Sequence, residues 1–187
     1  DVRGKGLDAV QMSARVLASF RERANDERDL AALMNRMEHA VSSALAEAED
    51  FVTAVLVQLD DSGRLTVTNA GHPPPLLIDR AGRTTSIDPP AIRPPLGLGG
   101  TAVAETRSLT PGDRLLLYTD GLTEARRPGD RSFFPHQEIV RALVDHAGVA
   151  SAIDALSRRV LAWSGGALHD DIAMVLVEYV PDEVGSG

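Results

Sequence analysis

Arg114-Leu-Leu-Leu-Tyr-Thr-Asp-Gly121 joins a short apolar run to an Asp-Gly pair, which indicates a buried strand that ends in a turn. Other short apolar runs precede it. Asp60-Asp-Ser-Gly63 and Asp79-Arg-Ala-Gly82 separate these runs and are typical of hairpin turns, so we expect largely antiparallel sheets. The expected strands cover residues 51–59, 65–68, 76–78, 84–87, 103–107, 114–118 and 172–179.

Helical periodicity appears on both sides of this strand-rich region. The spacing of apolar residues predicts helices over 7–24, 28–46, 136–146 and 151–164. The segment 88–100 is rich in proline and glycine and predicts a loop, and the polar segment 126–135 predicts a mobile one. This order indicates an α+β protein with helices layered on antiparallel sheets, and it argues against a doubly wound parallel fold.

The composition limits the classes of function. The 187 residues suffice for one domain, and the net charge of −8 argues against nucleic acid as a partner. The absence of cysteine excludes disulfides and thiolate metal sites. No apolar run approaches the roughly 20 residues that span a bilayer. The chain has no initiator Met and no signal-peptide pattern at its start, so we expect it to be a fragment of a longer protein.

Three aspartates share a setting at the ends of predicted elements. Asp1 precedes a Gly-rich turn into a helix, Asp120 follows a strand, and Asp170 precedes one. Strand ends at one sheet edge can bring such carboxylates together, where they repel one another unless a cation neutralises them. A hard divalent cation such as Mg²⁺ or Mn²⁺ prefers these oxygen ligands. Judged alone, however, each of these aspartates is better explained as a turn or capping residue.

Five segments along the chain change that weighting, because they form an ordered set of motifs. They are Asp1-Val-Arg-Gly-Lys-Gly6, Asn69-Ala-Gly-His-Pro-Pro74, Pro95-Leu-Gly-Leu98, Leu116-Leu-Tyr-Thr-Asp-Gly-Leu-Thr-Glu124 and Asp170-Asp-Ile172. The set resembles the SpoIIE/RsbU branch of the metal-dependent serine/threonine protein phosphatases, the type 2C-like PPM superfamily. The resemblance implies an α-β-β-α sandwich of two mainly antiparallel sheets flanked by helices, with the N-terminal strands missing. It implies a phosphatase domain over residues 1–180 and a frayed tail over 181–187.

The resemblance also implies a set of metal ligands and a reaction. Asp1 matches the aspartate that bridges two divalent cations, Mn²⁺ or Mg²⁺, and Val2 matches a neighbour whose backbone carbonyl binds one of them. Asp120 and Asp170 match the remaining ligands. In such a site a metal-activated water attacks the phosphorus of phosphoserine or phosphothreonine, so that Asp1, Asp120 and Asp170 are catalytic through the metal-bound water.

Four further residues are expected to support this site. Gly121 follows Asp120 in the motif, and Glu124 matches an acidic position that holds metal-bound water. Asp171 occupies a position that is often Asn in related phosphatases, which favours Asp170 as the ligand. His72 is expected to close the turn before Pro73, although a role near the metals is the alternative.

The resemblance implies partners as well. It points to a phosphorylated STAS-domain anti-anti-sigma factor as the substrate, in a cytoplasmic partner-switching pathway that controls a sigma factor in stress responses. It allows a homodimer and an upstream sensor domain in the full-length protein, and it implies no membrane contact in this domain.

Several alternatives stay open. A degenerate phosphatase-like module that binds or regulates a partner is the main rival function, while a two-metal phosphodiesterase is disfavoured because it would need a His-rich ligand set. Arg126, Arg127 and Arg131 form a basic cluster that is expected to be solvated, with contact to a phosphoprotein substrate as the alternative. His169 is expected to be a solvated loop residue.

Overall fold

The computed structural model describes residues 1–4, 6–43, 51–168 and 170–181. The chain forms two compact units. The first unit comprises Asp1–Pro74 and Ile87–Ser108, and the second comprises Pro75–Ser86 and Leu109–Gly187. Within the described ranges, no helix has both the length and the apolar character that crossing a membrane requires.

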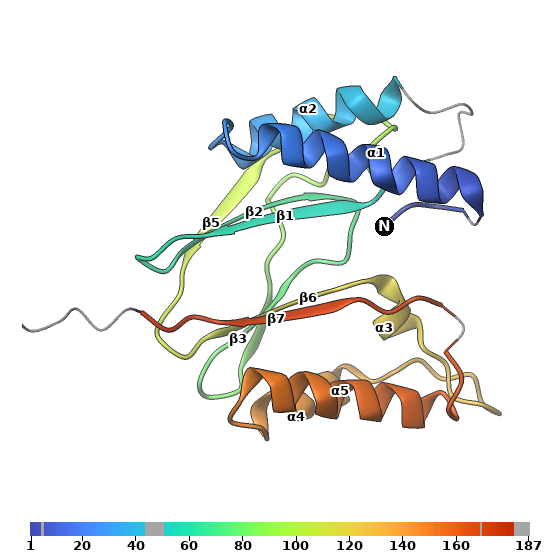
Figure 1. The fold of residues 1–187 in the computed structure, drawn as a ribbon. Helices are drawn as coiled ribbons and strands as arrows, with labels where there is room; N and C mark the ends of the chain where they lie inside the picture. The colour runs from blue at the N-terminus through green and yellow to red at the C-terminus, as the bar shows by residue number, and fades with distance from the viewer. Residues whose placement is uncertain (5, 44–50, 169, 182–187) are drawn as a thin grey trace, which may run out of the picture. The chain divides into compact units, whose positions relative to one another are not determined.

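The first unit is a three-stranded antiparallel sheet with two helices on one face (Figure 1). Its sheet has the order β1-β2-β5. The side chains of Leu33, Met34, Met37 and Val41 are buried in its core, and the carboxylate of Asp29 caps the second helix by accepting from the backbone of the first turn. The elements are α1 (Leu7–Arg23), α2 (Leu30–Ser42), β1 (Ala54–Leu59), β2 (Arg64–Ala70) and β5 (Ala104–Ser108).

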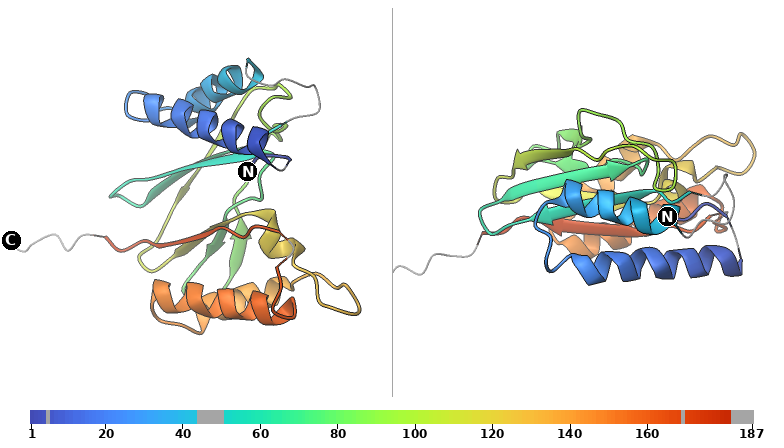
Figure 2. Two further views of the ribbon diagram at one scale, coloured as in Figure 1. Left: turned by 45° about the vertical axis from the view of Figure 1, so that its right-hand side comes forward. Right: turned by 90° about the horizontal axis from the view of Figure 1, so that it is seen from above.

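The second unit is a four-stranded antiparallel sheet of order β4-β3-β6-β7. Two helices, α4 and α5, lie side by side over one face of it, as the views of Figures 1 and 2 agree. Leu116, Leu143, Leu156 and Val160 are buried between the helices and the sheet. The elements are β3 (Leu76–Ile78), β4 (Thr84–Ser86), β6 (Arg114–Tyr118), α3 (Asp120–Glu124), α4 (His136–Val144), α5 (Val149–Trp163) and β7 (Met174–Glu178).

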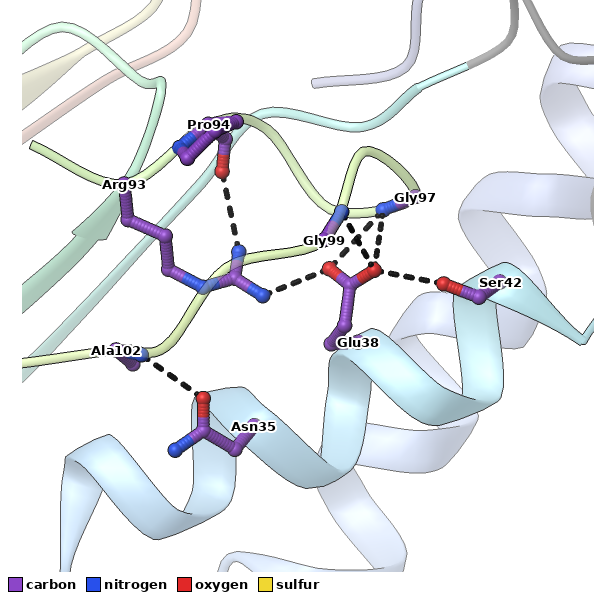
Figure 3. A network of polar contacts seen from close by, with 8 residues as sticks. All are labelled: Asn35, Glu38, Ser42, Arg93, Pro94, Gly97, Gly99 and Ala102. Carbon is purple, nitrogen blue, oxygen red and sulfur yellow. Dashed lines mark hydrogen bonds and ion pairs between the residues drawn. The ribbon is translucent and has the colours of Figure 1, made fainter.

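A buried ion pair ties α2 to the loop rich in proline and glycine (Figure 3). The side chains of Arg93 and Glu38 are 1% and 10% exposed, and Arg93 Nη2 lies 2.7 Å from Glu38 Oε2. The Glu38 carboxylate also accepts from Ser42 Oγ at 2.6 Å and from the backbone nitrogens of Gly97 and Gly99. The sequence predicted a loop here, and its attachment to a helix through a buried charge is a new finding.

The α+β class and the antiparallel sheets are confirmed, and each predicted strand and helix overlaps an observed one. Asp120-Gly121 is the clearest difference, because these residues begin the short helix α3 and do not form a plain turn. Residues 44–46 of the predicted second helix, His169 and residues 182–187 of the predicted tail lie outside the described residues.

Candidate active site

The segment that ends in Asp120 is fixed against the segment that follows Asp170. Beyond the paired strands β6 and β7, the Thr119 backbone nitrogen donates to the Ala173 carbonyl at 3.1 Å. The Thr119 hydroxyl accepts from the Ala173 nitrogen at 3.0 Å and donates to the Asp171 carbonyl at 3.2 Å. These bonds tie the residue before Asp120 to the segment that follows Asp170, and Thr119 is a positioning residue that the sequence patterns did not reveal.

Gly121 allows this close approach because it lacks a side chain. A Cβ atom at position 121 would lie 2.5 Å from the Asp171 carbonyl oxygen, closer than real Cβ contacts. Gly121 is buried, so a larger residue could not turn outward. Close packing against the Asp171 carbonyl therefore explains why glycine follows Asp120 in this structure.

Replacing Gly121 with Ala should separate the two segments. Overpacking of this kind costs about 1–3 kcal/mol of folding free energy, and we expect the phosphatase activity that the sequence motifs imply to fall more than stability does. Urea unfolding and a phosphatase assay measure the two effects. Gly148→Ala is the matched control, since its added Cβ meets only Ser151 Oγ at 3.4 Å. Wild-type activity in Gly121→Ala would contradict the packing argument.

Asp170, Glu124 and Gly121 line one cavity of about 360 Å³ in the second unit. Asp170 and Glu124 are exposed there, so their carboxylates are accessible to a ligand. Asp170 Oδ1 accepts from the Asp171 backbone nitrogen at 2.9 Å, which fixes the orientation of the carboxylate. Asp120 and Asp171 are not among the residues that line the cavity, so the preference for Asp170 over Asp171 as the ligand stays a prediction.

Asp1 and Val2 lie in the first unit, on a strand-like segment beside residues 51–53. The Asp1 backbone nitrogen donates to the Thr53 carbonyl at 2.7 Å, and the Thr53 nitrogen donates to the Asp1 carbonyl at 2.8 Å. Val2 and Val52 form an antiparallel bridge of the kind in which the facing residues exchange no hydrogen bonds. The Val2 carbonyl therefore points away from Val52, and within the described residues no backbone nitrogen donates to it.

His72 is held by two residues of the same unit, Thr53 and Asn69. Its Nδ1 lies 2.9 Å from Thr53 Oγ1. The Asn69 side chain accepts from the His72 nitrogen at 2.9 Å and donates to the His72 carbonyl at 2.8 Å, which closes the turn. Asn69 and Thr53 are thus the residues that position His72, and the role of His72 at the site stays a prediction.

The predicted site residues divide between the two units. Within the ranges that the structure describes, no three His, Asp or Glu side chains gather closely enough to hold a metal ion. The predicted metal ligands, the aspartate carboxylates and the Val2 carbonyl, all offer oxygen, the donor that Mn²⁺ and Mg²⁺ prefer. The second unit contains Asp120, Gly121, Glu124, Asp170 and Asp171, and the first contains Asp1, Val2 and His72.

Comparison with known families identifies the family of this chain. The model of the family described as Stage II sporulation protein E (SpoIIE) matches residues 1–180. This chain belongs to the SpoIIE family. The match covers both compact units, and it confirms the resemblance to SpoIIE/RsbU-type PPM phosphatases that the five motifs indicated.

Two curated relatives are much longer than this SpoIIE-family chain. Protein IcfG of Synechocystis sp. is 30% identical over 133 residues, which cover 68% of this chain and 20% of IcfG. Phosphoserine phosphatase RsbP of Bacillus subtilis is 28% identical over 130 residues, which cover 66% of this chain and 32% of RsbP. The chain thus spans a fifth to a third of the relatives it matches.

Solved structures show the same fold. The RsbU and RsbW domains of Rv1364c from Mycobacterium tuberculosis match with a TM-score of 0.77 at 25% identity, covering 98% of this chain and 52% of that one. The SiaA-PP2C domain of Pseudomonas aeruginosa has a TM-score of 0.83 at 20% identity, with 96% and 73% covered. The phosphatase PstP in complex with two manganese ions has a TM-score of 0.66 at 20% identity, with 96% and 86% covered.

Proposed function

We propose that this chain is the catalytic domain of a divalent-cation-dependent protein phosphatase that hydrolyses phosphoserine or phosphothreonine. The observation that carries the proposal is the packing of Thr119 and Gly121, which flank Asp120, against Asp171 and Ala173, in a chain of the SpoIIE family. The name of RsbP and the manganese ions of PstP support the reaction and the cofactor.

Asp120 and Asp170, together with the Asp1 carboxylate and the Val2 carbonyl, would hold two cations, Mn²⁺ or Mg²⁺. The Val2 carbonyl, to which no backbone nitrogen of the described residues donates, and the oriented Asp170 carboxylate support this assignment. Bound cations would supply charge neutralisation at the phosphate and a water that ionises near neutral pH. Because carboxylates at close range repel one another, we expect bound cations to stabilise the folded site.

The chain's own residues would orient the reactants. Thr119 and Gly121 hold Asp120 in place, and Glu124 presents a hydrogen-bond acceptor for water inside the cavity. The chain has no cysteine, so a thiolate nucleophile is not an option, and attack by water needs no nucleophile from the protein.

We propose a phosphorylated STAS-domain anti-anti-sigma factor as the substrate, acted on in the cytoplasm. The RsbP relative and the RsbU and RsbW domains of Rv1364c support this choice. A homodimer and an upstream sensor domain belong to the same proposal for the full-length protein.

Phosphate release from a phosphorylated STAS protein tests the proposal. With Mn²⁺ or Mg²⁺ we expect turnover, and with EDTA we expect none, because the carboxylates alone cannot activate water. An unphosphorylatable Ser→Ala STAS protein is the control for free phosphate. Hydrolysis that persists in EDTA would contradict the mechanism. Tight binding of the STAS protein without hydrolysis under any cation would favour the degenerate interaction module.

A further inference from the structure

Residues 125–134 form a closed hairpin, named here the arginine hairpin. The Phe134 nitrogen donates to the Ala125 carbonyl at 2.9 Å, and the Arg127 nitrogen donates to the Ser132 carbonyl at 2.9 Å. The Arg131 nitrogen donates to the Arg127 carbonyl at 3.1 Å and closes the tip. The segment predicted to be a mobile polar loop therefore contains a hydrogen-bonded hairpin.

The arginine hairpin is anchored on the C-terminal end of α5. Trp163 Nε1 donates to the Ser132 carbonyl at 3.2 Å, and the Arg127 guanidinium lies 3.7 Å from the centre of the Trp163 ring. A Cβ atom on Gly165 would lie 2.6 Å from Pro128 Cγ, so the tip packs closely on the turn after the helix. This anchoring gives the arginines of the hairpin a fixed platform.

The guanidinium groups keep hydrogen-bond donors available. Arg126 lies 4.3 Å above the Phe133 ring, and Arg127 lies above a ring as well. Stacking uses the face of a guanidinium and leaves its N–H edge for an anion. Arg131 is exposed and forms no ion pair with a carboxylate in the described part of the chain.

One carboxylate, Asp130, offsets part of this positive charge. Its Oδ2 lies 3.9 Å from Arg127 Nη1, at the limit of an ion pair. Its Oδ1 is occupied by the Ser132 nitrogen and hydroxyl at 3.0 and 2.8 Å. Hydrogen bonds from Ser132, led by the backbone one, lower the pKa of Asp130, so it stays charged. The hairpin keeps an excess of positive charge.

Arg131 occupies a strained backbone position. Its φ of 57° is the one positive value among the described residues other than glycine. A left-handed conformation costs about 1–2 kcal/mol for a residue with a Cβ atom. Glycine would avoid this cost, and strain of this kind gathers at functional sites. Arg131 therefore lines the cavity at a cost in backbone conformational energy.

The arginines and the carboxylates line the same cavity of about 360 Å³. Arg126, Arg127 and Arg131 lie among its lining residues together with Glu124 and Asp170. The volume falls in the range of roughly 300–1,000 Å³ that is typical of ligand pockets. The net charge of the protein is −8, so its surface outside the cavity repels an acidic partner. The arginines of the cavity would therefore determine where such a partner binds.

Resting on the proposed function, we propose that the arginine hairpin is a specificity site that binds an acidic residue next to the phosphoserine of a protein substrate. The carboxylates of the cavity, Glu124 and Asp170, lie on the side for the reacting phosphate. The arginines of the cavity bind the carboxylate of the flanking residue. Arg131 is the central donor because it has no competing carboxylate, and Arg127 supports it.

Three substrates separate flank recognition from chemistry. They are a phosphoserine peptide with Asp on both sides, the same peptide with Ala on both sides, and p-nitrophenyl phosphate. We expect Arg131→Gln to lower kcat/KM for the Asp-flanked peptide about tenfold through KM, the contribution of one charge-assisted hydrogen bond. The other two substrates should be unaffected. Arg158→Gln removes an exposed arginine of α5 outside the cavity and is the matched control.

Charge reversal and direct binding complete the test. Arg131→Glu should reverse the preference toward a Lys-flanked peptide. Equal losses on all three substrates would assign the arginines to the reacting phosphate and overturn the proposal, as would no loss at all. Fluorescence anisotropy of the labelled Asp-flanked peptide in EDTA needs no catalysis. Weaker binding to Arg131→Gln supports the specificity site even if hydrolysis fails, whereas equal binding overturns it.

Discussion

Replacing Asp120 with Asn should lower kcat/KM for a phosphoserine protein by roughly 10²–10³-fold. Asn keeps the size of the side chain and one oxygen, but it loses the negative charge that holds a divalent cation. A cation supplies several kcal/mol of stabilisation to a phosphoryl transition state, and each ~1.4 kcal/mol is a factor of ten in rate. Initial rates measured across a range of Mn²⁺ concentrations check this expectation. Part of the loss should be recovered at high Mn²⁺, because weaker binding raises the concentration that is needed.

Asp171→Asn is the comparison for that experiment. Asp171 neighbours Asp170, and its contact with Thr119 uses its backbone carbonyl, which Asn retains. We therefore expect a loss within a few-fold. If Asp171→Asn were as damaging as Asp120→Asn, or if Asp120→Asn kept full activity, the assignment of ligands would be wrong.

Replacing Glu38 with Gln should destabilise the protein by about 3–5 kcal/mol, the range for breaking a buried ion pair from one side. Arg93 is 1% exposed and would keep its charge after losing the carboxylate that pairs with it. Among the described residues its Nε has no hydrogen-bond partner, which leaves little room for compensation. Urea unfolding measures the change. Glu22→Gln, at an exposed position of α1, should shift stability by no more than about 0.5 kcal/mol.

The same ion pair should make stability depend on pH. Burial acts to raise the pKa of Glu38, but hydrogen bonds from Ser42, Arg93 and Gly97 outweigh it and lower the pKa below the ordinary value of 4.5. A carboxylate with a depressed folded-state pKa stabilises the fold above its unfolded value and loses that contribution as pH falls. Wild type should therefore lose more stability than Glu38→Gln as the pH falls below 4.5. Parallel pH profiles for the two proteins would contradict this account.

Local sequence patterns predicted the helices and strands of this fold well, but they did not predict contacts between residues that are distant in the sequence. Alternating apolar residues located the strands that bury one face, and continuous apolar runs located the strands that bury both faces. Glu38 and Arg93 are 55 residues apart, and a charge on an amphipathic helix looks like part of its solvated face. Asp120–Glu124 is too short for helical periodicity, so its helix was predicted as a turn.

The candidate site shows the same division. The motifs selected Asp120, Gly121 and Asp170, but only the structure explains Gly121, through the carbonyl of Asp171. The arginine hairpin depends on Trp163, which lies 31 residues beyond Ser132 in the sequence, and no local signal joins them. The assembly of Asp1 and Val2 with Asp120 and Asp170 into one centre remains a prediction.

Anomalous diffraction at the manganese edge, from crystals of this chain grown with Mn²⁺, tests that assembly most directly. The account predicts two manganese peaks, with Asp1 between them, the Val2 carbonyl on one, and Asp120 and Asp170 among the ligands. An Asp120→Asn crystal under the same conditions should lose at least one peak. Manganese bound only at other residues, or no manganese in a crystal of the active protein, would contradict the proposed phosphatase centre.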